Sequence, residues 1–484
     1  MALDSGHLDE ETVRDVEQYV ADWMSENGVP GASVALVDGD ELTYAEGFGA
    51  RDLDEDLPAT PGTLYGIGSC TKSVVATAVL QCVERTELEL SDPIADYLPH
   101  LAAVPGDPIT VESLLNHTSG MPSDGNLSAL VTRLTDIGDA NTPLTSDDDF
   151  RRHVEGSVDE RYTEAEHFFY YNTGFSLLGD LVAAVTGVEF ERYVRSELFE
   201  PLGMKRSCFS QSRFEAEDDR MSAYYEEADE DGDSVWVEGS LGFSETMYAP
   251  GGLASSVVET SRFLRALMHD GAYDGERVLE TGSVDVMTTP SATRYETVDG
   301  VEREYCYGLS SQDYLGDRLV GHGGMMGTTT AYIGYLEDAE VGVVVACNTA
   351  PAQHPTVAGH ALLAILQGET PERAVPQLAL EAKADRLVGE YGSYKGIQQA
   401  TVEKDGTTLS VDVGSLSVST LMIGTWTERV STCRNPTNAF HGRRESTTRS
   451  TTTTAPSPVD TLAPGLRLRL FRTSSGRLNG LNDA

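Results

Sequence analysis

Ser69 and Lys72 lie three residues apart in the stretch GIGSCTKSVVATAVL (66–80), where small residues lead into an apolar run. If a helix begins at Ser69, the two side chains share one helix face. A serine hydroxyl is a weak nucleophile until a base removes its proton. A lysine can be that base when burial and nearby positive charge lower its pKa. The pair therefore indicates acyl transfer, although the same spacing also occurs at ordinary helix starts.

A second group of polar residues lies in FFYYNTGFSLLG, at positions 168–179. Tyr170 and Asn172 fit a Y-x-N pattern, in which a phenol shares the proton relay of the serine and an amide positions the substrate. A turn of aromatic core residues is the alternative for this stretch taken alone. We treat Tyr170 as a candidate catalytic residue and Asn172 as a candidate substrate-binding residue.

A third stretch, GHGGMMGT (321–328), follows a predicted strand. We treat His322, Gly323 and Gly324 as candidate substrate-binding residues, because small residues let a substrate approach the strand edge. The backbone N–H of Met325 can then join that of Ser69 as an oxyanion hole. A histidine beside glycines in a loop is the alternative interpretation.

The elements that would position these residues come from distant parts of the chain. Residues 10–27 have helical spacing, and GASVALVDGDELTYAEGFG (31–49) reads as a hairpin. Strand patterns return after about residue 300, and a last helix is expected across 357–367. This order predicts an α+β fold, with an antiparallel sheet flanked by terminal helices and a mostly helical insert at about 74–300. A cleft between sheet and insert is the expected place for the site.

We expect the first domain to span 1–370, a linker to span 371–383, and a small β-barrel-like domain to begin at 384–420. The segment 421–484 has a different composition, with nine arginines, four acidic residues and a run of serine and threonine. A disordered tail is one interpretation of this segment. A shifted reading frame is the other, because aspartate codons read out of frame become threonine or arginine codons.

The formal net charge of -44 excludes a nucleic-acid binder, because the protein's own field would repel the phosphates. Such acidity with 40% hydrophobic residues predicts a solvated acidic shell of the kind that halophilic proteins carry. The six cysteines are scattered and form no C-x-x-C pair, which supports neither a zinc site nor a disulfide framework. H-E-x-x-H and P-loop motifs are absent as well, and we expect no metal and no cofactor. No apolar run is long enough to span a membrane and no signal peptide is visible, so a cytoplasmic location is the default expectation.

Together the three stretches resemble the serine beta-lactamase and penicillin-binding-protein superfamily. The likeness is greater to its class C branch, which includes D-aminopeptidases and esterases. Four further segments are similar to that group: LELSDPIADYLP (88–99), LLNHTSGMP (114–122), APGGLASS (249–256) and RVLETGSVDVMTTP (277–290). The resemblance extends over about residues 8–368 and implies a beta-lactamase/transpeptidase-like fold. The β-domain that follows resembles the small lipocalin-like barrel that often accompanies this enzyme class.

The resemblance implies that Ser69 is the acylated nucleophile, that Lys72 and Tyr170 exchange its proton, and that Asn172 contacts the substrate. It also implies that the histidine of HTSG (117–120) belongs to a structural turn. The chain departs from the lactamases at His322, where they usually carry the lysine of a lysine-threonine-glycine motif. Histidine is neutral for much of the time near neutral pH.

This departure favours an esterase or a peptidase of D-amino acids over a lactamase, with a small ester or peptide as the substrate. A beta-lactamase or D-alanyl-D-alanine carboxypeptidase is the alternative among enzymes. A catalytically weak protein that binds a peptide through the same fold is the alternative outside them. The sequence leaves the oligomeric state open.

Overall fold

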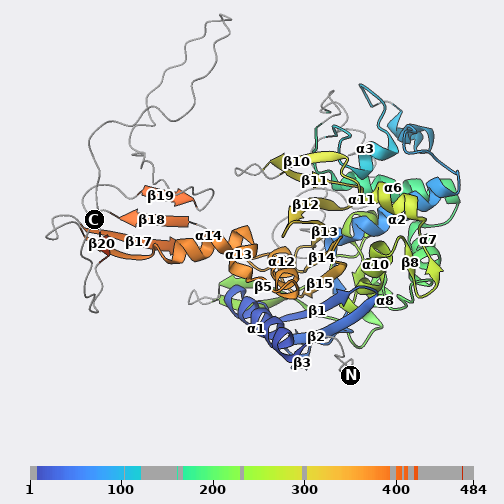
Figure 1. The fold of residues 1–484 in the computed structure, drawn as a ribbon. Coiled ribbons are helices and arrows are strands. Elements are labelled where there is room, and N and C mark those ends of the chain that lie inside the picture. The colour runs from blue at the N-terminus through green and yellow to red at the C-terminus, as the bar shows by residue number, and fades with distance from the viewer. Residues whose placement is uncertain are drawn as a thin grey trace, which may run out of the picture. The chain divides into compact units, whose positions relative to one another are not determined.

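A computed structural model describes residues 8–102, 104–121, 161, 167–228, 234–296, 302–392, 399–405, 408–412, 419–422 and 471–472 (Figure 1). The chain divides into two compact units, Met1–Ala374 and Val375–Ala484.

The first unit is built on a nine-stranded sheet in which every neighbouring pair is antiparallel. Strands from the early and late parts of the first unit meet where β15 pairs with β1, so the sheet is complete only when both parts are present. The order across the sheet is β10 (Ala292–Glu296), β11 (Glu302–Tyr305), β12 (Ser310–Tyr314), β13 (Asp317–Met325), β14 (Thr330–Leu336), β15 (Val341–Cys347), β1 (Gly31–Asp38), β2 (Glu41–Asp52) and β3 (Leu57–Pro58).

Helices pack on this sheet (Figure 1). The first helix, α1 (Glu10–Asn27), packs against α12 (Pro355–Leu366), which packs against β14 and β15. A third helix, α10 (Val257–Met268), contacts β1 and β15. Every residue of β14 and β15 is buried. Strands covered on both faces carry continuous apolar runs rather than an alternating pattern, which explains the valine-rich sequence of β15.

The insert between the two parts of the sheet is mostly helical, with three short two-stranded pairings. Its helical elements are η1 (Gly68–Cys70), α2 (Thr71–Glu84), η2 (Ile94–Asp96), η3 (Pro99–Leu101), α3 (Val111–Leu115), α6 (Asn172–Thr186), α7 (Phe190–Val194), η5 (Arg195–Phe199), α8 (Gln211–Glu215), α9 (Glu245–Gly251), α10 and α11 (Thr281–Thr288). The pairings join β4 (Tyr65–Gly66) to β7 (Ala254–Ser255), β5 (Ala223–Ala228) to β6 (Ser234–Gly239), and β8 (Ala272–Tyr273) to β9 (Glu276–Arg277).

The centre of the insert is α2, which is buried at every position from Thr71 to Cys82. It packs against α6, α7, α9 and α11. A helix surrounded in this way must be apolar on all sides, as the run of valine and alanine after Lys72 is. The single lysine in its first turn is therefore an exception that its surroundings must explain.

The expected α+β fold is confirmed, with terminal helices beside a large antiparallel sheet. The first helix has the bounds expected from its spacing, and the hairpin of β1 and β2 forms as expected. The last helix begins two residues before the expected start, because Pro355 occupies its first turn. The main sheet resumes at β10, somewhat before residue 300.

The second unit contains α14 (Pro376–Asp385) and a five-stranded sheet, and short α13 (Pro371–Ala374) precedes it. The segment expected as a linker therefore holds helices. The order of the sheet is β19 (Ser419–Met422), β18 (Thr408–Asp412), β17 (Gln399–Asp405), β16 (Gly389–Gly392) and β20 (Phe471–Arg472). The tail expected at 421–484 lies outside the described residues, apart from 421–422 and 471–472.

Within the described part of the chain, no single helix has the length and apolar character needed to cross a membrane. One pair of helical segments, Asn172–Thr186 and Phe190–Phe199, meets those criteria only when its members are taken together across a 77° bend.

Candidate active site

The candidate nucleophile lies on a tight turn between β4 and α2. The turn, η1, is 3₁₀-helical and continues directly into α2, so Ser69 and Lys72 share a face as their spacing predicts. Gly68 has a φ of 53°, and a Cβ at this position would lie 2.4 Å from the Met325 nitrogen. Only glycine fits such a backbone and such a close approach. Ser69 itself is half-buried.

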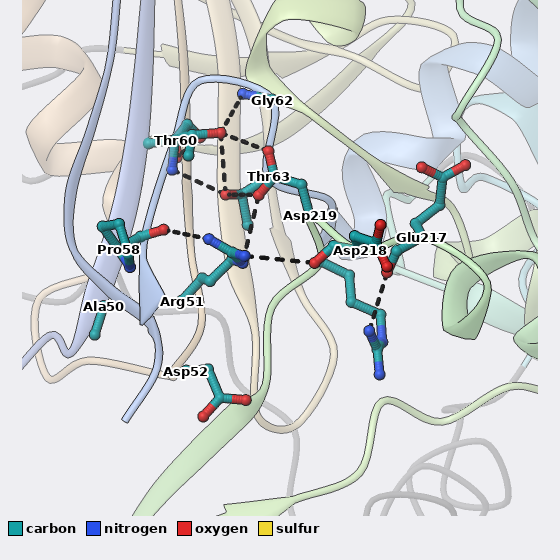
Figure 2. A network of polar contacts seen from close by, with 12 residues as sticks. Ala50, Arg51, Asp52, Pro58, Thr60, Gly62, Thr63, Glu217, Asp218 and Asp219 are labelled. Atoms are coloured by element: carbon teal, nitrogen blue, oxygen red, sulfur yellow. Dashed lines mark hydrogen bonds and ion pairs between the residues drawn. The ribbon is translucent and has the colours of Figure 1, made fainter. Parts of the chain in front are cut away.

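The chain leading into this turn is anchored by a polar network around Asp219 (Figure 2). The carboxylate of Asp219 accepts hydrogen bonds from the hydroxyls of Thr60 (2.6 Å) and Thr63 (2.7 Å). It also forms an ion pair with Arg51, whose guanidinium donates to the Pro58 carbonyl. The network fixes the chain just before β4 and so helps to hold η1 in place.

Lys72 is completely buried, with 0% of its surface exposed. Its Nζ lies 3.0 Å from Ser69 Oγ, 2.7 Å from Asn172 Oδ1 and 2.6 Å from the Pro250 carbonyl oxygen. A neutral amine has two N–H groups and one lone pair. When Lys72 is neutral, the amide and carbonyl oxygens can accept its two N–H groups. The lone pair is then left for the Ser69 hydroxyl, which is the arrangement that a general base requires. When Lys72 is protonated, the same three oxygens can accept from its ammonium group.

Two aromatic rings enclose the same amine. Nζ lies 5.0 Å from the ring centroid of Tyr170 and 5.3 Å from that of Phe175. The face of an aromatic ring attracts a cation, so both rings stabilise the ammonium that forms when Lys72 accepts a proton. Asn172 begins α6, and Phe175 lies one turn further along the same helix.

The end of β13 packs directly against the nucleophile turn. A Cβ on Gly324 would lie 1.9 Å from the Ile67 carbonyl oxygen and 2.9 Å from the Ser69 nitrogen. Gly324 therefore allows the backbone of Ile67 and Ser69 to approach β13 closely. From the sequence, this glycine is predicted instead to make room for a substrate. A Cβ on Gly323 would lie 2.7 Å from Thr356 Oγ1, on α12.

The Met325 N–H direction follows from the alternation of hydrogen-bonded and non-hydrogen-bonded residue pairs between β13 and β14. Met326 and Thr329 exchange both backbone hydrogen bonds. The next pair along the hairpin, Met325 and Thr330, is therefore of the non-hydrogen-bonded kind. The Met325 N–H points away from β14, on the side where Gly68 approaches its nitrogen.

His322 is buried, with 6% of its surface exposed, and belongs to a hydrogen-bonded chain with Tyr305 and His117. The Tyr171 N–H donates to His117 Nδ1 at 3.1 Å, so a neutral His117 carries its proton on Nε2, 3.2 Å from the Tyr305 oxygen. His322 Nδ1 lies 2.6 Å from the Gly323 carbonyl oxygen, which can only accept. His322 Nε2 is then the acceptor for the Tyr305 hydroxyl, at 3.1 Å.

All three members of this chain are uncharged at neutral pH. Burial and the charge of Lys72 lower the pKa of His322 from 6.5 to about 3 and hold the pKa of His117 well below 6.5. Burial raises the pKa of Tyr305 well above 10. The imidazoles of His117 and His322 bind protons more readily in the unfolded chain than in the folded protein. Their contribution to stability is therefore present above about pH 6.5 and is lost as the pH falls towards 3.

Sequence reasoning identifies His322 but misses the other two members of this hydrogen-bonded chain. The family resemblance assigns His117 to a structural turn, and its φ of 60° and position after α3 agree with a turn. Its ring, however, lies 4.3 Å from that of Tyr170, measured between centroids. Tyr305 carries no motif, and its 188-residue separation from His117 leaves no local signal. Pro250 lies in a family-like segment, and no local pattern predicts its contact with Lys72.

We expect Tyr305→Phe to lower both stability and acylation. The change leaves one buried donor on His117 and one buried acceptor on His322 without a partner, each costing about 1–3 kcal/mol. The melting temperature of the variant should lie below that of the wild type from pH 7 to pH 4, and labelling of Ser69 should be slower. Tyr314→Phe is the matched control, because the hydroxyl of this buried tyrosine bonds only the His360 carbonyl among the contacts described. Equal labelling rates in the two variants would contradict the expectation.

Among the described residues, no group of three histidine, cysteine, aspartate or glutamate side chains is placed to hold a metal ion.

Comparison with known proteins connects this geometry to a family. Residues 16–367 match the Beta-lactamase family, and residues 371–444 match the Pab87 octamerisation domain. The structure titled "octameric penicillin-binding protein homologue from Pyrococcus abyssi" is 32% identical and has a TM-score of 0.75. The similarity covers 84% of this chain and 89% of that one. A penicillin-binding protein from Bacillus halodurans, 21% identical with a TM-score of 0.56, shares the fold.

Curated relatives are more distant. The "Putative penicillin-binding protein PbpX" of Bacillus subtilis is 27% identical over 59% of this chain and 65% of its own length. "Protein flp" of Staphylococcus aureus is 27% identical over 44% of this chain and 41% of its own length. The chain thus spans less than two thirds of either relative. The match over most of the first unit, the shared fold and the arrangement of Ser69 and Lys72 lead to one conclusion: the chain belongs to the beta-lactamase family of serine hydrolase folds.

Proposed function

We propose that this protein is a serine hydrolase that transfers the acyl group of a small ester or amide to Ser69 and then to water. The observation that carries the proposal is the position of Lys72 Nζ, between Ser69 Oγ and two oxygens that accept its N–H groups. This arrangement makes the buried amine a base aimed at one hydroxyl.

In the acylation step, Lys72 takes the Ser69 proton while Oγ forms a bond to the substrate carbonyl carbon. The N–H groups of Ser69 and Met325 receive the oxyanion that develops. Collapse of the tetrahedral intermediate breaks the bond to the leaving alcohol or amine, which receives the Ser69 proton from Lys72 through Tyr170. In deacylation, Lys72 takes a proton from water as the water oxygen bonds to the acyl carbon. The bond to Ser69 Oγ then breaks, Oγ receives that proton, and the free acid leaves. Asn172 helps to orient the substrate.

The substrate class follows from the third motif. His322 is neutral and its described hydrogen bonds go to Tyr305 and Gly323, so it supplies no fixed cation for a substrate carboxylate. This favours neutral esters, or peptides of D-amino acids as in the family branch that the sequence resembles. A substrate-binding role for His322 itself stays a prediction.

A beta-lactamase or D-alanyl-D-alanine carboxypeptidase is the second candidate, and Arg294 favours it. Its guanidinium lies 5.9 Å from the ring centroid of Phe168, and its charge contributes to lowering the pKa of both His117 and His322. A cation near the site can receive a substrate carboxylate in place of the missing lysine.

A substrate panel decides between these candidates. Purified protein would be assayed with nitrophenyl esters, D-amino acid anilides and nitrocefin, and labelled with a fluorophosphonate and a fluorescent penicillin. Turnover of esters or anilides supports the proposal, and turnover of nitrocefin supports the second candidate. Stoichiometric binding of peptide without labelling or turnover would show a binding protein instead.

We also propose that the second unit mediates self-association. The support is its match to an octamerisation domain, together with the octameric neighbour from Pyrococcus abyssi. Light scattering on the full chain measures the assembly directly. A mass of one chain at micromolar concentration in molar salt would reject self-association.

A further inference from the structure

His354 lies at the start of α12, where it caps the helix. Its Nδ1 accepts a hydrogen bond from the Thr356 N–H at 3.1 Å. The Thr356 hydroxyl lies 2.9 Å from the same nitrogen. Nδ1 is therefore an acceptor, and in the neutral ring the proton is on Nε2. Burial lowers the pKa of His354 below 6.5, which keeps the ring neutral.

The other side of the ring faces the end of β13. His354 Nε2 lies 3.1 Å from the carbonyl oxygen of Gly324, and the fixed tautomer makes Nε2 the donor. The glycine beside it keeps this approach open, because a Cβ on Gly323 would lie 3.0 Å from the His354 ring. One imidazole thus joins the first turn of α12 to one backbone carbonyl of β13.

That carbonyl belongs to the same peptide unit as the Met325 N–H. In a trans peptide the C=O and the N–H point in opposite directions. The Gly324 carbonyl points towards β14 and His354, and the Met325 N–H points towards Gly68 and the nucleophile turn. By the alternation of the ladder this carbonyl also pairs with Ala331 of β14. A second hydrogen bond, from His354, helps to fix the plane of the peptide and polarises it, which strengthens its N–H as a donor.

We propose that His354 is a positioning residue that holds the Gly324–Met325 peptide unit so that the Met325 N–H is aimed at the oxygen of the reacting carbonyl. The inference rests on the proposed acyl transfer at Ser69 and adds a residue to it. His354 touches neither the nucleophile nor the base among the contacts described, and it acts through one backbone bond.

Two substitutions separate this role from helix capping. Asparagine at position 354 retains an acceptor for the Thr356 N–H and is a strong capping residue, but it is too short to reach Gly324. Glutamine places an amide N–H near the position of Nε2 but caps a helix poorly. A structural role alone predicts that H354N behaves like the wild type and that H354Q is impaired. The proposed role predicts the reverse order for catalysis.

The test measures the second-order rate of Ser69 acylation by a nitrophenyl ester and the affinity for a boronic acid, whose tetrahedral adduct places an oxygen in the oxyanion hole. Removing one direct oxyanion donor costs about 10²–10³-fold. We therefore expect H354N, which weakens a donor indirectly, to lose on the order of tenfold in both measurements. Its melting temperature should stay near that of the wild type. H354Q should retain most of the rate.

The possible results separate the role of His354 from the proposed hydrolase function. An H354N variant that acylates and binds the boronic acid as the wild type does would overturn the role of His354 while leaving the hydrolase intact. An H354Q variant slower than H354N would overturn it as well, since capping would then be the feature that matters. A wild-type protein whose Ser69 reacts with no probe would reject the proposed function itself, and the role of His354 with it.

Discussion

Replacing Ser69 with alanine should abolish acyl-enzyme formation and leave the fold intact. The substitution removes the side-chain oxygen that the proposed mechanism bonds to the substrate carbon in the first step. Residues that act as one unit have non-additive effects, so a further change at Lys72 should add little to the loss. A fall of at least about 10⁴-fold in ester turnover is expected, of the size seen when a serine nucleophile is removed. Mass spectrometry of the labelled protein measures the adduct directly.

The matched control for this prediction is Ser73→Ala. Ser73 lies one turn further along α2, is completely buried, and donates its hydroxyl to the Cys70 carbonyl at 2.8 Å. Its loss should affect stability more than Ser69→Ala does, and labelling less. Ester turnover by Ser69→Ala at the wild-type rate would show that another group is the nucleophile.

The parts of the fold that could be predicted have local signals. The first helix shows in its apolar spacing, and the β1–β2 hairpin shows in two apolar runs around a tight turn. The pairing of β1 with β15 joins residues more than 300 positions apart, so the pattern alone indicates strands and not their order. The class C assignment within the family stays a prediction, as do the halophilic interpretation and the interpretation of residues 421–484 as a disordered or frameshifted tail.

In the candidate site, too, contacts between residues close in sequence could be predicted and long-range contacts could not. Ser69 and Lys72 are three residues apart, and one helical turn brings them together whatever the rest of the chain does. The Lys72 contact with Pro250 spans 178 residues, and the Tyr305 bond to His117 spans 188. Such contacts depend on how α9 and β11 pack, which no short motif encodes. Family resemblance supplied roles for Tyr170 and Asn172, but no role in the site for His117 or His354.

The second large effect is expected from Gly324→Ala, which adds one methyl group at the contact between β13 and η1. The new Cβ would lie 1.9 Å from the Ile67 carbonyl oxygen and 2.9 Å from the Ser69 nitrogen. Both neighbours are backbone atoms, so no rotamer change relieves the overlap. The strand and the turn must separate by an ångström or more to reach ordinary contact, and the N–H groups of Ser69 and Met325 then lose their common target.

A misplacement of about 1 Å costs on the order of 10²-fold in rate, and loss of an oxyanion donor costs about 10²–10³-fold. We therefore expect Gly324→Ala to slow acylation of Ser69 by at least about 10²-fold. Gly282→Ala is the matched control, because a Cβ at that helical position meets no atom within 4 Å, and alanine there should stabilise α11 slightly. Acylation by Gly324→Ala at the rate of Gly282→Ala would mean that the proposed reaction does not depend on the contact between β13 and the nucleophile turn.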